Sequence, residues 1–97
     1  MNATKEHGSL AALKRRIKVG TVLRCIENTY RPELNDKRRV VTKTAGNSFC
    51  WQTVGKEAEE RNSWTYYPKA AGLSWLNEDE FKMHLFDDHY VTLLIER

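Results

Sequence analysis

Two short segments near the C-terminus, 81–86 and 90–96, alternate apolar and polar residues. The apolar residues that fall on one face are Phe81, Met83 and Leu85 in the first segment, and Val91, Leu93 and Ile95 in the second. A period of two residues is typical of a half-buried strand, because successive side chains point to opposite faces of a sheet. The polar residues Asp87-Asp88-His89 separate the two segments. The pattern therefore predicts an antiparallel hairpin whose one face must be covered by a core.

Four earlier segments, 21–27, 38–44, 48–54 and 63–67, are also rich in β-branched or aromatic residues and are predicted to be strands. The residues that bound them favour turns or end ladder pairing: Gly20, the turn Ala45-Gly46-Asn47, and Pro68. Within the segment 48–54, Phe49 and Trp51 fall on one face and Cys50, Gln52 and Val54 on the other. Residues 69–80 fit either a strand or a turn.

One short helix is predicted before the first strand. Ser9 is a candidate N-cap, and Leu10, Leu13 and Ile17 follow at helical spacing ahead of Gly20. A helix of two turns is marginal on its own, so these apolar residues must pack against the rest of the protein. We interpret residues 1–9 as a flexible tail and residues 10–97 as a single β-rich domain.

These elements predict a mainly β fold: a small SH3-like antiparallel barrel of five to six strands with a short N-terminal helix. Closure into a barrel removes exposed strand edges, which favours it for a chain with little helix to cover them. A small α+β sandwich is the alternative.

The composition is that of an ordinary globular protein, with 40% hydrophobic and 30% charged residues. The apolar stretches are far shorter than the roughly 20 residues of a membrane-spanning helix, and the N-terminal residues lack the apolar core of a secretory signal. We therefore expect a cytoplasmic protein without membrane contact. Cys25 and Cys50 are then expected to be reduced and buried.

The sequence contains no nucleophile elbow and no glycine-rich phosphate loop, so we predict a non-enzymatic protein without a cofactor. Metal-ligand residue types cluster once, as His84, Asp87, Asp88 and His89. The two histidines fall on opposite arms of the predicted hairpin, and turn propensity explains the two acids, so no metal site is assigned. An uncharacterised enzyme or a metal site remains the lesser alternative.

Charge is distributed unevenly along the chain. Residues 1–48 hold 11 Lys and Arg against 4 acids, whereas residues 49–97 hold 5 against 9. Basic side chains attract nucleic-acid phosphates. The predicted nucleic-acid-binding residues are Lys14, Arg15, Arg16, Lys18, Arg38, Arg39 and Lys43, with Tyr30, Trp51, Trp64, Tyr66 and Tyr67 as candidates for base stacking. The competing interpretation puts Trp51, Trp64 and Trp75 in the core, and the sequence does not say whether the basic residues share one face.

The ten residues 28–37 form a loop that is long for a hairpin, and long loops are more often functional than idle. The loop contains Tyr30, Arg31 and Leu34, and Tyr and Arg are frequent among interface hot spots. An alternative function is therefore an effector that binds a host protein through these residues. A long first loop is also routine in SH3-like barrels, so the loop is equally explained by the fold.

Several segments resemble small uncharacterised proteins encoded by bacteriophages of actinobacteria. They are residues 20–30, Arg39-Val40-Val41, Ser48-Phe49-Cys50-Trp51, Ser63-Trp64 and Tyr67-Pro68-Lys69-Ala70. The resemblance covers residues 17–95 in outline and implies a small accessory protein that binds nucleic acid or a host protein. It assigns no binding residues. The opening Lys18-Val19-Gly20-Thr21-Val22 also resembles the start of the KOW element of ribosomal and transcription-factor barrels.

Overall fold

The computed structural model describes residues 9–97, in which seven strands form one antiparallel sheet beside one short helix. In chain order the elements are α2 (Leu10–Arg16), β1 (Val22–Asn28), the 3-10 turn η1 (Pro32–Leu34), β2 (Arg38–Thr44), β3 (Ser48–Thr53), β4 (Ser63–Tyr66), the 3-10 turn η2 (Ala70–Gly72), β5 (Leu73–Trp75), β6 (Glu80–His84) and β7 (Tyr90–Glu96). The prediction of a mainly β fold is confirmed.

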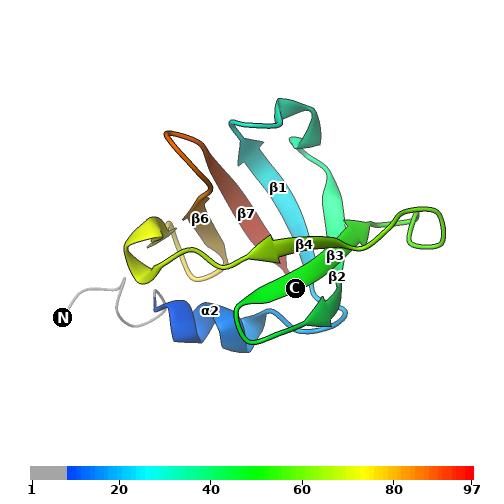
Figure 1. Ribbon diagram of the computed structural model, residues 1–97, viewed down its shortest axis with the longest axis horizontal. Helices are drawn as coiled ribbons and strands as arrows, with labels where there is room; N and C mark the ends of the chain where they lie inside the picture. The colour runs from blue at the N-terminus through cyan, green and yellow to red at the C-terminus, as the bar shows by residue number, and fades with distance from the viewer. Residues whose placement is uncertain (1–8) are drawn as a thin grey trace.

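The sheet consists of two meanders that meet in its middle. The strand order is β4-β3-β2-β1-β7-β6-β5, so the meander β1–β4 joins the meander β5–β7 through the pairing of β1 with β7 (Figure 1). The register shifts between Cys25 and Glu27 in β1, and between Val41 and Lys43 in β2. Bulges of this kind bend a strand and increase its twist, which curves the sheet.

The prediction of a closed barrel with five to six strands is wrong, because the sheet has seven strands and stays open. Closure needs hydrogen bonds between the two edge strands. Here the edges are β4 and β5, which do not pair. The chain leaves β4 through Pro68, which has no N–H to donate, and turns through η2 before β5 begins. The sequence left residues 69–80 undecided between strand and turn. They hold both the 3-10 turn η2 and β5, a strand in addition to the six that the sequence predicted.

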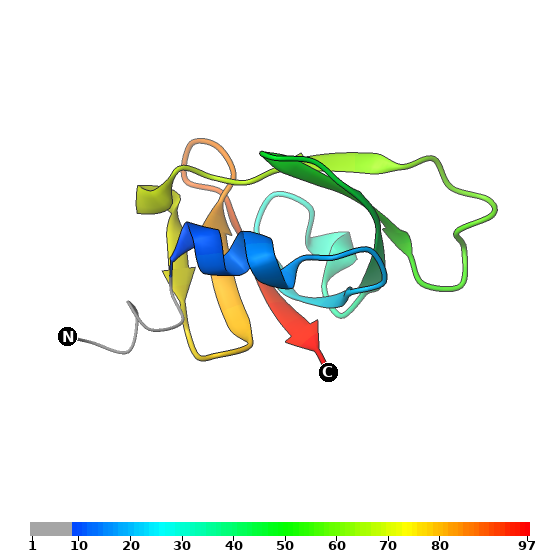
Figure 2. The same ribbon diagram turned by 90° about the horizontal axis from the view of Figure 1, so that it is seen from below.

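Helix α2 lies across one end of the curved sheet, whereas the loop 28–37 and the turn 85–89 stand at the opposite end (Figures 1 and 2). Ser9 caps the helix as expected, since its side chain accepts a hydrogen bond of 2.9 Å from the N–H of Ala12. Leu13 and Ile17 are buried, and Leu10 packs against the core. This packing supplies the stability that so short a helix lacks by itself.

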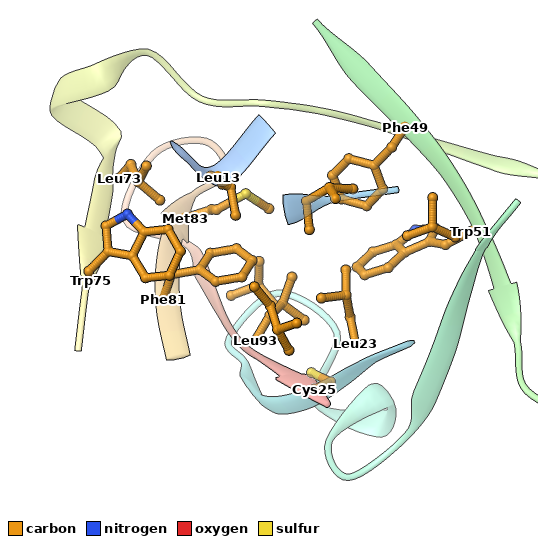
Figure 3. Packing of buried hydrophobic residues seen from close by; sticks show 14 residues of the cluster. Leu13, Leu23, Cys25, Phe49, Trp51, Leu73, Trp75, Phe81, Met83 and Leu93 are labelled. Carbon is orange, nitrogen blue, oxygen red and sulfur yellow. The ribbon is translucent and has the colours of Figure 1, made fainter. Parts of the chain in front are cut away.

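The core lies on the concave face of the sheet and draws side chains from the helix and from every strand except β4 (Figure 3). Its buried members are Leu13, Ile17, Leu23, Cys25, Val41, Phe49, Trp51, Leu73, Trp75, Phe81, Met83, Val91, Leu93 and Ile95. The alternation that predicted the final hairpin is confirmed, because every buried apolar residue of β6 and β7 belongs to the predicted faces.

Two further sequence predictions concern the N-terminal tail and membrane contact. The predicted tail 1–9 lies, apart from Ser9, outside the described residues. Among residues 9–97, no helix has the length and apolar character needed to cross a membrane.

Candidate nucleic-acid interface

A groove of about 560 Å³ lies where the end of α2 approaches the first and last strands, and basic side chains line it. Arg15, Arg16 and Lys18 come from the end of the helix and the following loop, Arg38 comes from β2, and Arg97 follows β7. Residues 20–22 and Ile95 supply most of the remaining wall. The groove therefore gathers five basic side chains from three distant parts of the sequence.

The loop between α2 and β1 fixes the helical part of this groove. Gly20 adopts a φ of 96°, a conformation that favours glycine, and its N–H donates to the carbonyl oxygen of Val41 at 2.8 Å. Val41 in turn donates its N–H to the carbonyl oxygen of Thr21 at 2.8 Å. The Thr21 hydroxyl accepts from the N–H of Lys18 at 3.1 Å. These bonds hold the basic end of the helix against β2.

Carboxylates partly neutralise the groove. The Asp79 carboxylate accepts hydrogen bonds from Arg16 at 2.8 Å and from Arg97 at 3.0 Å, and Arg38 donates to Glu96 at 2.7 Å. Arg97 also lies 3.6 Å from the Glu78 carboxylate. Within residues 9–97, Arg15 and Lys18 form no ion pair. These two side chains are the donors that the groove leaves open to an anion.

Acidification is expected to remove the contribution of Asp79 to stability. The hydrogen bonds from Arg16 and Arg97 hold the pKa of the Asp79 carboxyl below its usual value of 3.8. A carboxyl whose pKa is lower in the folded state stabilises the fold above its unfolded pKa, and that contribution disappears as the pH falls through the folded pKa. The difference in the free energy of unfolding between wild type and Asp79→Asn should therefore shrink below pH 3.8.

Chemical unfolding of both proteins between about pH 7 and about pH 2 measures this difference. Asp88→Asn is the matched control, because Asp88 forms no ion pair among the described residues. A difference between wild type and Asp79→Asn that stayed constant over the whole range would contradict the expectation.

The structure brings together four of the seven basic residues that the sequence predicted: Arg15, Arg16, Lys18 and Arg38. The other three lie elsewhere. Lys14 sits 5.4 Å from the centroid of the Tyr67 ring, and Arg39 sits 4.7 Å from that of the Trp51 ring. Lys43 is exposed on β2, opposite Cys50 of β3.

Sequence reasoning missed Arg97. This residue reaches the groove because β7 pairs antiparallel with β1, which sets Glu96 opposite Val22. The final hairpin was predictable from its alternation, but the alternation does not say which strand lies on its other side. The available signal was a basic residue directly after a predicted strand, and that signal alone does not separate Arg97 from other surface charges.

None of the five aromatic residues considered for base stacking lines the basic groove. Trp51 is buried and Tyr67 is half-buried, where burial raises the pKa of its hydroxyl to about 12. Trp64 and Tyr66 are 51% and 69% exposed on the edge strand β4, so the prediction that Trp64 belongs to the core is wrong. Trp51 and Trp75 do belong to it.

The three residues predicted for protein binding, Tyr30, Arg31 and Leu34, line a second groove of about 560 Å³ that shares no residue with the basic one. Their loop is held in one shape by two asparagines. The Asn28 side chain accepts from the N–H groups of Tyr30 and Arg31, and the Asn35 side chain accepts from the N–H of Asn28. The loop is long because it forms a hydrogen-bonded turn that contains η1.

The two histidines at the β6–β7 turn already have contacts within the protein. His84 Nε2 lies 2.8 Å from the carbonyl oxygen of Asp87, and His89 Nδ1 lies 3.2 Å from the Thr29 hydroxyl. Across residues 9–97, no three His, Cys, Asp or Glu side chains are grouped so as to hold a metal ion. Cys25 and Cys50 are buried free thiols, and burial raises the pKa of Cys25.

Comparisons of the chain with models of protein families, with curated proteins and with solved structures found no match.

Proposed function

We propose that this chain is a small non-enzymatic binding module of the phage accessory type, which acts in the cytoplasm and binds nucleic acid through the basic groove. The observation that carries the proposal is the convergence of Arg15, Arg16, Lys18, Arg38 and Arg97 on one groove. Guanidinium groups suit phosphate oxygens because their planar donors form paired hydrogen bonds.

The charge balance of the groove supports phosphate as its ligand. Five basic side chains face the carboxylates of Glu78, Asp79 and Glu96, which leaves an excess of positive charge. The paired arginines are held in place by their carboxylates, whereas Arg15 and Lys18 are free to exchange counterions for phosphates. No aromatic candidate lines this groove. The basic side chains therefore contact the sugar-phosphate backbone of the nucleic acid and carry no preference for particular bases.

Fluorescence anisotropy with labelled duplex DNA, single-stranded DNA and single-stranded RNA tests the proposal at low salt. Arg15→Ala/Lys18→Ala is expected to weaken binding at least about tenfold, because two phosphate contacts are lost. The matched control is Lys56→Ala/Lys69→Ala, which removes the same charge at exposed positions outside the groove and should have a smaller effect. Equal losses in both variants, or no binding at micromolar protein, would contradict the proposal.

A further inference from the structure

The second groove runs along the free edge of the sheet. It is lined by the consecutive residues 63–68 on one side, and by Tyr30, Arg31 and Leu34 of the loop together with Leu85 and Phe86 of the β6–β7 turn on the other. Because six consecutive residues contribute, from both faces of β4, the groove follows the edge of this strand. Arg39 and Trp51 belong to its lining between the two walls.

The edge of β4 offers unpaired backbone groups to this groove. Among residues 9–97, β4 has β3 as its sole strand neighbour. The N–H of Tyr67 donates to the carbonyl oxygen of Asn47, on the β3 side. Backbone direction alternates along an antiparallel strand, so the N–H and C=O groups of Trp64 and Tyr66 point toward the free edge. An extended peptide in the groove would form main-chain hydrogen bonds with both residues.

Arg39 brings a positive charge into the groove, and the Glu60 carboxylate attracts it from beyond ion-pair distance. Its guanidinium stacks 4.7 Å from the centroid of the Trp51 ring, and it forms no ion pair among the described residues. Burial lowers the pKa of Arg39, because water solvates the charged form less well in this groove, and the Glu60 carboxylate opposes the shift. A carboxylate from a ligand would form the direct ion pair that Glu60 does not, and its hydrogen bonds with the planar guanidinium would be strong.

The free main-chain edge of β4, rather than the aromatic rings, favours a peptide over bases as the occupant. Trp51 is buried beneath Arg39 and Tyr67 is half-buried, whereas Trp64 and Tyr66 of the β4 wall are 51% and 69% exposed. Tyr30 meets Phe86 edge to face, with centroids 4.7 Å apart, and both are about half exposed. With Leu34 beside them, these rings form an apolar seat for one side chain of a ligand.

We propose that this groove binds an extended acidic peptide segment of a protein partner, which pairs with the free edge of β4 and places a carboxylate on Arg39. The segment adds an eighth strand to the sheet, and main-chain hydrogen bonds supply much of its affinity. One apolar side chain of the segment rests against Tyr30 and Phe86. The site is separate from the basic groove and does not depend on nucleic-acid binding.

The test is a selection of random displayed peptides of about twelve residues on the immobilised full chain, followed by affinity measurements with the selected peptides as synthetic compounds. Selected peptides should share an Asp or Glu next to an apolar residue on the same face. Arg39→Gln should weaken their binding at least about 30-fold, and Tyr30→Ala should do the same. Tyr66→Pro should also weaken binding, since it removes one edge N–H and spares the bonds to β3.

Two measurements separate recognition from damage to the fold. Replacing the acidic residue of the peptide by its amide should weaken binding to wild type and leave binding to Arg39→Gln unchanged, a coupling that a destabilised fold does not produce. Arg15→Ala/Lys18→Ala should bind the peptides as tightly as wild type does. A loss of nucleic-acid binding can therefore be told apart from a loss of peptide binding. Failure to enrich any peptide, enrichment without acidic residues, or equal binding to Arg39→Gln would overturn the proposal. Arg39-dependent binding of single-stranded DNA in this groove would overturn it in favour of a second nucleic-acid site.

Discussion

Replacing Leu13 by alanine is expected to lower the free energy of unfolding by about 3 kcal/mol, within the usual range for a fully buried leucine. Leu13 is 0% exposed and packs into the core from α2. The substitution removes its apolar contacts and leaves a cavity at the end of the sheet that the helix covers. Urea unfolding followed by circular dichroism measures the loss, with an unchanged m-value showing that unfolding remains cooperative.

Leu76→Ala is the matched control for this substitution, because it deletes the same atoms from a side chain that is 55% exposed. Its effect should stay within about 0.5 kcal/mol. If Leu13→Ala proved as mild as Leu76→Ala, α2 would be a peripheral element, and the placement of the basic groove at its end would lose its support.

The affinity for duplex DNA is expected to fall about 500-fold when salt rises from roughly 50 to roughly 200 mM, if all five basic side chains of the groove contact phosphates. Each contact contributes a slope of about −0.9 to the logarithm of affinity against the logarithm of salt concentration. Five contacts therefore give a slope of about −4.5. If Arg15 and Lys18 alone contact phosphates, the slope would be about −1.8, and the affinity would fall roughly 12-fold over the same range of salt.

Anisotropy titrations at several salt concentrations measure this slope, and so count how many of the paired arginines exchange their carboxylates for phosphates. Arg15→Ala/Lys18→Ala should reduce the steepness by about 1.8, whereas Lys56→Ala/Lys69→Ala should leave it nearly unchanged. A slope that does not respond to the first double substitution would place the phosphate contacts outside the basic groove.

Local patterns in the sequence were sufficient wherever a structure depends on near neighbours. The alternation of Phe81 and Met83 with polar residues set the face that β6 buries, and Ser9 set the start of α2. In both cases the deciding interactions span only a few residues, through the period of the strand or the reach of a capping side chain. The same reasoning found Tyr30, Arg31 and Leu34, which share a groove because they share a loop.

Tertiary structure decided everything that depends on which distant strands pair. The pairing of Val22 with Glu96 brings Arg97 to Arg15, and no periodicity within either segment specifies that partner. The sheet stays open, leaving Trp64 exposed on an edge, because the edge strands β4 and β5 do not meet. A strand pattern fixes which face is apolar, but its neighbours are chosen by the packing of the whole core, including Leu13 of the helix, and that choice is a property of the assembled chain.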